Sequence, residues 1–198
     1  MAIMPHPERT LGNEADDLFK SMRNYMESDD PFSFKSLNFS SKKINIKKFK
    51  KPAKQNEILV STIIADNEAA SVEKCINSLG VKAKVKKYLH FEIDATDRLD
   101  INTIVSTDVL FNPSKEYIAN IKEESDIYRF LVRSKDDIVG QSLAQTLQDR
   151  FNLSGLKSIK KGVVWEVKIN SSRAKKDVDI ILNSHIFSNP ISQECHEY

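Results

Sequence analysis

Hydrophobic and polar residues alternate with two different periods in the second half of the chain. In YRFLVRS (128–134) and GVVWEVKI (162–169) apolar residues recur at every second position, which predicts strands. In DIVGQSLAQTLQDRF (137–151) and RAKKDVDIILNSHI (173–186) they recur at every third or fourth position, which predicts helices. With a further short strand at residues 156–160, the predicted order is β-α-β-β-α.

The same order is predicted between residues 57 and 122, and three sequence matches relate the two parts. The matching pairs are LVST (59–62) with LVRS (131–134), KKYLHFEID (86–94) with KKGVVWEVK (160–168), and VLFNP (109–113) with HIFSNP (185–190). The offsets are 72, 74 and about 77 residues. Ordered matches at nearly one offset predict an internal duplication. We therefore expect an α+β fold with two tandem β-α-β-β-α repeats, 57–122 and 126–198.

Single residues in these repeats carry further expectations. Phe91 and Trp165 occupy matching strand positions and are predicted to be core residues. Gly80 and Gly155 follow the first helix of each repeat, where a left-handed residue commonly ends a helix. His90 alternates with Phe91, so we expect it at solvent or at an interface.

One face of each predicted sheet keeps apolar residues that the helices of the same repeat cannot cover. These residues are Leu59, Ile63, Leu131 and Val164. The nearest cover is the equivalent surface of the other repeat, which is tethered by only a few residues. We therefore expect the repeats to pack as a pseudo-dimer about a pseudo-twofold axis.

The first 56 residues have a different pattern. EADDLFKSMRNYM (14–26) predicts a short helix with Asn13 as its N-cap. Residues 29–56 lack sustained periodicity and are predicted to be a linker, and residues 40–55 hold seven Lys and no acid. Such a segment with Phe49 could contact phosphates and stack a base, but no RNA-binding signature follows, so a solvated linker is the favoured interpretation.

Composition sets the cellular context. The chain has 198 residues, 40% of them hydrophobic, a formal net charge of +2 and two Cys. Two Cys without a secretory signal indicate a reducing compartment, and no apolar run approaches the length of a membrane span. We expect a cytoplasmic protein that does not insert into a membrane.

The candidate chemistry lies in PHPER (5–9). His6 and Glu8 lie at i and i+2, where a carboxylate can orient an imidazole as in a nucleophile triad. Neither Cys75 nor Cys195 lies in the Gly-x-Cys-x-Gly turn that exposes a nucleophile. The sequence thus supplies a base and its orienter without the nucleophile that they would serve.

Two stretches resemble components of phosphoribosylformylglycinamidine synthase. IMPHPERTLGN followed by DDLFKSM resembles the C-terminal piece of the class I glutaminase (PurQ-type) subunit, over about residues 2–26. FLVRSKDDIVGQSLAQTL and VVWEVKI resemble the small PurS-type subunit, whose Asp-x-x-Gly motif is kept at Asp137 and Gly140. In the first repeat Asp66 is kept, but Ala69 stands at the Gly position.

The resemblance implies an organisation and a function. Residues 1–28 would be a glutaminase tail, 29–56 a Lys-rich linker, and 57–122 and 126–198 two PurS-like repeats. His6 and Glu8 would be the remnant of a Cys-His-Glu triad that releases ammonia from glutamine, and the chain would bridge the glutaminase and synthetase components in purine biosynthesis. Whether it belongs to a longer glutaminase–PurS fusion stays open.

The same resemblance sets expectations for catalysis and partners. The chain would be a component of a glutamine-dependent ligase, and by itself it is expected not to be catalytic because the Cys nucleophile is missing. We expect no cofactor in this chain, with ATP and Mg bound by the synthetase partner. Partners would be the synthetase and glutaminase components, with self-association left open, and the alternative function is nucleic-acid binding through the Lys-rich segment.

Overall fold

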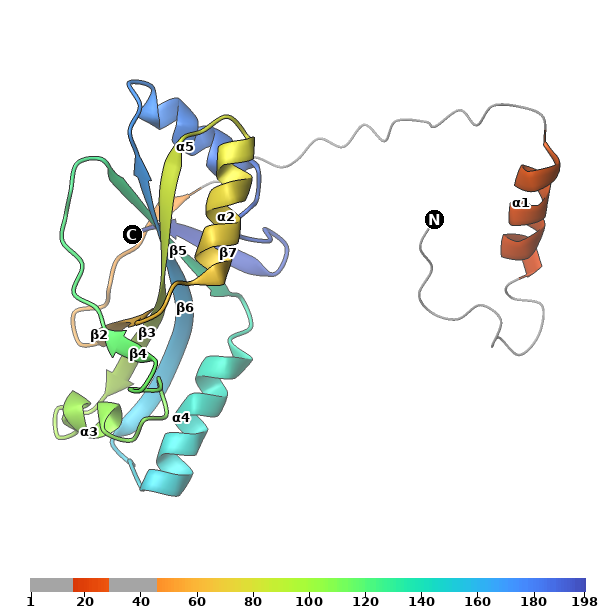
Figure 1. Ribbon diagram of the computed structural model, residues 1–198. Coiled ribbons are helices and arrows are strands. Elements are labelled where there is room, and N and C mark those ends of the chain that lie inside the picture. Colours follow the sequence, from red (N-terminus) through yellow and green to blue (C-terminus); the bar gives the residue numbers. More distant parts are fainter. Residues whose placement is uncertain (1–15, 29–45) are drawn as a thin grey trace. The chain divides into compact units, whose positions relative to one another are not determined.

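The computed structural model describes residues 16–28 and 46–198 (Figure 1). The chain divides into two compact units, Met1–Ser40 and Ser41–Tyr198. The described part of the first unit is helix α1 (Asp16–Glu27), at the position that the sequence predicted. Its N-cap candidate, Asn13, lies outside the described residues.

The second unit is an α+β domain built on one mixed sheet. Its seven described strands are β1 (Lys47–Lys48), β2 (Asn56–Thr62), β3 (Ala83–Ala95), β4 (Glu116–Ile118), β5 (Ile127–Ser134), β6 (Leu156–Ile169) and β7 (Gln193–Glu197). Its described helices are α2 (Asn67–Ser78), α3 (Ile101–Val105), α4 (Ile138–Phe151) and α5 (Ala174–Asn183). The strand order in the sheet is β1-β7-β5-β6-β3-β2-β4, and only the β1–β7 pair is parallel.

From β2 onward the chain runs twice through strand, helix, strand, helix and strand. We call residues 56–118 the first half and residues 127–197 the second half. The halves meet edge to edge where the long strands β3 and β6 pair antiparallel. Leu89 lies opposite Val163 at the middle of this pairing, Lys86 lies opposite Glu166 on one side, and Glu92 lies opposite Lys160 on the other.

The predicted order β-α-β-β-α is therefore wrong in two respects. The two strands expected around Gly162 are one continuous strand, β6, because Gly162 lies inside the ladder rather than at a turn. A Cβ at Gly162 would meet Leu131 Cδ1 at 2.9 Å and Val132 O at 3.0 Å, so close packing explains the glycine. Each half also ends in a strand, β4 or β7, that is too short to show clear alternation.

All four helices of this unit pack on one face of the sheet. α2 and α5 cover a core that contains Val85, Phe130 and Trp165, while α3 and α4 cover a core that contains Phe91 and Ile93. Trp165 and Phe91 are 4% and 1% exposed, which confirms the predicted core positions. None of the helices in the described part of the chain combines the length and apolar character needed to cross a membrane.

The ends of α2 and α4 show what the Asp and Gly residues at these positions do. Asp66 accepts hydrogen bonds from the backbone N–H groups of Glu68 and Ala69, and Asp137 accepts one from Gly140. A Cβ at Gly140 would lie 2.4 Å from the carbonyl oxygen of Ile159, so α4 approaches β6 too closely for Ala. After the C-terminal end of α2, Gly80 has a positive φ of 84°, as the sequence predicted.

The left-handed residue at the end of α4 is Asn152, with φ of 54°, and not Gly155 as the sequence predicted. Asn tolerates this conformation because its short polar side chain can bond locally. Gly155 instead lies beside Thr96, whose backbone N–H donates to the Gly155 carbonyl at 2.8 Å. A Cβ on Gly155 would meet Thr96 Oγ1 at 2.8 Å, so this glycine also serves packing.

The face without helices is covered by two loop segments of the same unit. Leu59, Tyr88, Leu131 and Val164 form one buried cluster across both halves, with Phe49 and Tyr198 packed on one side and Ala119 and Ile121 on the other. Leu59, Leu131 and Val164 thus share one sheet surface instead of facing each other across two sheets. Ile63, expected to be covered as well, is 62% exposed.

Candidate functional site

Ionisable side chains gather on the helix-free face, where the two halves join. Seven of them come from outward positions of β2, β3, β5 and β6, where each neighbour along the strand points to the helix-covered face, and the eighth, Tyr198, follows β7. The members are Glu57, His90, Glu92, Arg129, Arg133, Lys160, Glu166 and Tyr198. We call this set the central network.

The first part of the central network surrounds His90. His90 is 0% exposed, so it lies at the junction between the halves and not at solvent. Its Nδ1 lies 3.3 Å from Arg133 Nη2, and its Nε2 is bonded to Glu57. Because an arginine can only donate, Nδ1 accepts and Nε2–H donates to the Glu57 carboxylate. The hydroxyl of Tyr198 donates to the same carboxylate at 2.9 Å.

These contacts set the pKa of Glu57. Burial alone would raise the pKa, but the hydrogen bonds from His90 and Tyr198 and the nearby charge of Lys51 lower it below its ordinary value. Burial beside Glu57 raises the pKa of the Tyr198 hydroxyl, which keeps this group protonated as a donor. Glu57 is therefore held as an anion with fixed donors.

Phe49 closes this part of the network. Its ring stacks on Tyr198 and meets His90 edge-on, each with a centroid separation of 5.7 Å, and the Arg133 guanidinium lies 4.9 Å from the ring centre. The backbone N–H of Phe49 donates to Glu197 O at 2.6 Å. The sequence offered Phe49 as a surface for stacking a base, but here the ring is engaged in packing against the protein itself.

The second part of the network surrounds Glu92, which is 3% exposed. Arg133 reaches Glu92 at 3.0 Å from β5, and Lys160 lies 3.4 Å away on β6. Gly162 is the residue directly between Arg133 and His90 in the sheet, so the absence of a side chain there leaves the path for Arg133 open. This path explains how an arginine of the second half neutralises a glutamate of the first.

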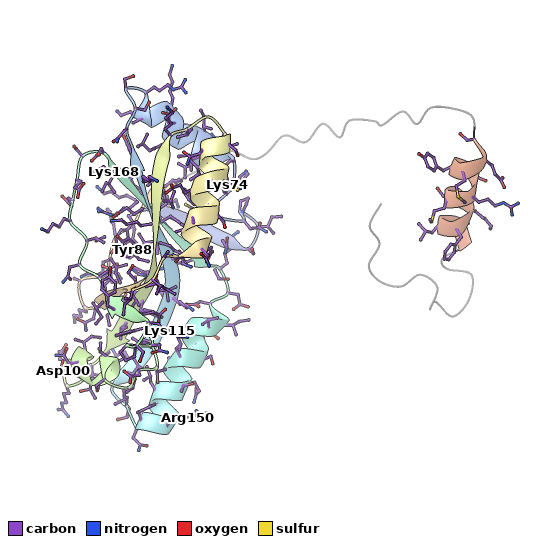
Figure 2. All side chains as sticks on the ribbon, in the orientation of Figure 1. Lys74, Tyr88, Asp100, Lys115, Arg150 and Lys168 are labelled. Carbon is purple, nitrogen blue, oxygen red and sulfur yellow. The ribbon has the colours of Figure 1, made fainter. Side chains whose placement is uncertain are left out.

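The third part surrounds Glu166, which is 5% exposed. Arg129 lies opposite Glu166 in the sheet and bonds it at 2.8 Å, and Lys86 lies 3.8 Å from it. Tyr88 lies on the adjacent strand β3 with its hydroxyl 3.5 Å from the carboxylate, and burial raises its pKa to about 12. Figure 2 labels Tyr88 and Lys168, two residues of the pocket beside this part.

That pocket has a volume of about 330 Å³ and several basic residues in its wall. Most of these cations are already paired with carboxylates. Lys84 bonds Glu73, Lys168 bonds Glu124 and Asp126, and Arg129 bonds Glu166. Together with Glu73 and Asp126, which lie outside the wall, four carboxylates stand against the five cations of the wall.

The central network holds no nucleophile of the kind that a triad needs. Cys195 alternates with His196 on β7 and packs with the helix-covered core, on the opposite face from His90. Burial raises the pKa of the Cys195 thiol to about 11, so little thiolate is present at neutral pH. Cys75 is exposed on α2. Among the described residues there is also no group of three side chains that could hold a metal ion.

The predicted site residues His6 and Glu8 lie outside the described residues. The central network was not predicted from the sequence, although a signal exists. His90, Glu92 and Glu166 are ionisable residues inside long strands whose alternate positions are strongly apolar. Local sequence does not show which of these residues become buried, because their burial depends on the pairing of β3 with β6 and on the cover by Phe49 and Tyr198.

Comparison of the sequence with protein-family models gives no match, and comparison with curated proteins gives none either. Chemically, the central network is a set of neutralised charges with fixed geometry. It links the two halves because Arg133 of the second half bonds His90 and Glu92 of the first, while Lys86 of the first lies beside Glu166 of the second.

Proposed function

We propose that residues 57–122 and 126–198 are two copies of one PurS-like unit, joined in one chain as a pseudo-dimer. The observation that carries this proposal is the register of β3 and β6. Under the offset of 74 residues between the matching segments, Lys86 corresponds to Lys160 and Glu92 to Glu166. The pairs Lys86–Glu166 and Glu92–Lys160 are therefore exchanged by a two-fold axis through Leu89 and Val163. A homodimer of single units would have this register.

The turns before β4 and β7 support the same interpretation. At Asn112 and Asn189 the backbone N–H donates to the side chain four residues later at 2.8 Å in both turns. The side-chain oxygen of each Asn accepts from the N–H two residues later at 2.9 Å in both turns. Before these turns, Asp108 and His185 have matching φ values of 56° and 57°. A common ancestral unit accounts for this repetition.

We further propose that the chain is an accessory component of phosphoribosylformylglycinamidine synthase, joining the glutaminase to the ATP-dependent synthetase for ammonia transfer. The family resemblance of residues 2–26 and 130–169 supports this role. A scaffold role is also compatible with a central network that ties two halves together and offers no nucleophile. In this proposal residues 1–28 derive from a glutaminase, with His6 and Glu8 as its triad remnant, and ATP and Mg belong to the synthetase partner.

Reconstitution tests the proposed role. The chain would be mixed with purified glutaminase and synthetase components of the same organism, and synthetase turnover would be followed with glutamine or with ammonium as the nitrogen source. We expect the chain to raise the glutamine-dependent rate and to leave the ammonium-dependent rate unchanged, because a bridge matters only when ammonia passes between subunits. Equal glutamine-dependent rates with and without the chain would overturn the proposal.

A glutamate-release assay tests the chain alone. We expect no release from glutamine, because the Cys195 thiol is held protonated and lies on the other face of the sheet from His90. Variants Cys75→Ala and Cys195→Ala serve as controls for an unexpected nucleophile. Release that either substitution abolishes would contradict the expectation.

A further inference from the structure

Two pockets of similar size lie at corresponding places in the two halves. The pocket beside the start of α2 has a volume of about 390 Å³, and the pocket beside the start of α4 has about 400 Å³. We call them the α2 pocket and the α4 pocket. Each contains the helix-capping aspartate, Asp66 or Asp137, and two consecutive lysines of the long strand, Lys86 and Lys87 or Lys160 and Lys161.

The charges of the two pockets differ. In the α2 pocket the two lysines are matched by two carboxylates, those of Asp66 and Glu73. The wall of the α4 pocket contains four cations, Arg133, Lys135, Lys160 and Lys161, and only the two carboxylates of Asp137 and Glu194. Glu92, outside the wall, pairs with both Arg133 and Lys160, so the α4 pocket has one positive charge in excess.

The two pockets differ most in the ion pairs of the second lysine, Lys87 in the α2 pocket and Lys161 in the α4 pocket. Lys87 bonds Glu68 at 2.5 Å and lies 3.3 Å from Asp66. Burial would lower the pKa of Lys87, but these two carboxylates raise it above its ordinary value. Val139 takes the place of Glu68 in α4, and within residues 46–198 the Lys161 ammonium forms no ion pair. The Asp137 carboxylate is used by backbone N–H groups, those of Gly140 at 2.8 Å and Lys161 at 2.6 Å.

The remaining cations of the α4 pocket are also incompletely balanced. Lys135 Nζ donates to the carbonyl oxygens of Pro190 and Ile191, at 3.0 and 2.8 Å, and these carry no net charge. Lys160 and Arg133 share the single carboxylate of Glu92. The Nε–H of Arg133 is buried without a hydrogen-bond acceptor, an arrangement that is costly when no ligand is bound.

From this comparison we propose that the α4 pocket binds a phosphate monoester of a small polar molecule. A phosphate monoester carries close to two negative charges at neutral pH, and its oxygens can pair with the Lys161 ammonium and accept from the buried Nε–H of Arg133. Guanidinium and ammonium groups, together with the hydroxyls of Ser134 and Ser158 in the wall, suit phosphate oxygens. A volume of about 400 Å³ leaves room for an organic group beside the phosphate. This inference is independent of the proposed role in purine synthesis.

Titration calorimetry of the full chain with glucose 6-phosphate, inorganic phosphate and glucose tests the proposal. We expect glucose 6-phosphate to bind more tightly than inorganic phosphate, glucose not to bind, and the affinity to fall as salt is raised. Lys161→Met should weaken binding roughly tenfold, since it removes one charge-assisted contact, while Lys161→Arg should retain it. Lys87→Met, at the matching position of the α2 pocket, is the control and should leave the affinity unchanged.

Three results would overturn the proposal. They are the absence of glucose 6-phosphate binding to the unmodified chain at millimolar concentration, equal affinities for inorganic phosphate and glucose 6-phosphate, and equal losses in Lys161→Met and Lys87→Met. A thermal unfolding curve of each variant distinguishes a lost contact from a lost fold. Lys161→Gln provides a second neutral variant should Lys161→Met fail to fold.

Discussion

Two glutamates at matching positions, Glu92 and Glu166, are both buried and both neutralised, but by different means. Glu166 has Arg129 directly opposite in its own half, so an ordinary cross-strand pair is sufficient. Glu92 has Glu57 directly opposite, a like-charge pair that would be destabilising by itself. Arg133 from the other half and the bonds from His90 and Tyr198 to Glu57 offset that repulsion.

The neutralisation of Glu92 by Arg133 depends on one small residue, Gly162. Gly162 corresponds to Tyr88 under the 74-residue offset, and the two positions fill the same space differently. At position 88 the tyrosine ring covers the sheet face beside Glu166. At position 162 there is no side chain, and the side chain of Arg133 crosses over the glycine. Equivalent positions can therefore diverge strongly when a change on one strand is compensated on its neighbour.

Filling the space over Gly162 should have the largest effect. In Gly162→Val the new side chain would overlap Leu131 and displace Arg133, whose Cγ lies 3.0 Å from a Cβ at this position. We expect the free energy of unfolding to fall by about 4 kcal/mol, from overpacking together with a buried glutamate left without its arginine. Urea unfolding measures it.

Lys157→Val is the control for this substitution, because it places the same side chain at an exposed position of the same strand. It should change the unfolding free energy by less than about 0.5 kcal/mol. Equal effects of the two substitutions would show that the path of Arg133 over Gly162 is not important for stability.

Substituting Arg133 and Arg129 separately compares the neutralisation of Glu92 directly with that of Glu166. Arg133→Met should cost about 3 kcal/mol, because Glu92 then keeps only Lys160 and faces Glu57 across the strands. Arg129→Met should cost less, about 2 kcal/mol, because the residue opposite Glu166 becomes neutral and Lys86 remains nearby. Urea unfolding of both variants gives the difference.

A double substitution sharpens this test. Adding Glu57→Gln should restore part of the stability of Arg133→Met, since it removes the like charge opposite Glu92. The same addition to Arg129→Met should restore nothing. Additive effects in both backgrounds would contradict the idea that Arg133 offsets the repulsion between Glu57 and Glu92.

The sequence predicted the long elements better than the short ones. β5, α4, α5 and α1 lie close to the predicted ranges, because their apolar periodicity extends over two or more turns or several strand residues. α3 (Ile101–Val105) has only five residues, because the chain turns at Asp108 with a positive φ. β1 could not be predicted from two lysines, since its pairing with β7 is a property of the sheet.

The candidate sites were less predictable for a related reason. The sequence placed His90 at solvent or at an interface, and its burial follows from the pairing of β3 with β6 and from the position of Phe49. Arg133 lies 41 residues from Glu92 in the chain, so no local spacing could connect them. By contrast, the cap of α4 by Asp137 was visible as the Asp-x-x-Gly signature, because capping is local.

A smaller effect is expected at the C-terminal residue of the chain. Tyr198→Phe removes the hydroxyl that donates to Glu57 at 2.9 Å but keeps the ring stacked on Phe49. The loss of one hydrogen bond to a partly buried carboxylate should lower the free energy of unfolding by about 1 kcal/mol. Tyr117→Phe, at a tyrosine that is 49% exposed, should have almost no effect in the same measurement.

The smallest effect concerns Glu57 and appears only in acid. The folded-state pKa of Glu57 is below its ordinary value, so Glu57 contributes stability that is fully present above about pH 4.3, the ordinary glutamate value, and is lost as the pH falls through the folded-state pKa. Glu57→Gln cannot titrate, so its unfolding free energy should decline less steeply than that of the unmodified protein below that pH. Urea unfolding at a series of pH values between 3 and 7 measures both curves. Parallel curves would mean that the bonds from His90 and Tyr198 do not favour the ionised carboxylate, and the account of how the Glu57–Glu92 pair is tolerated would then have to rest on Arg133 alone.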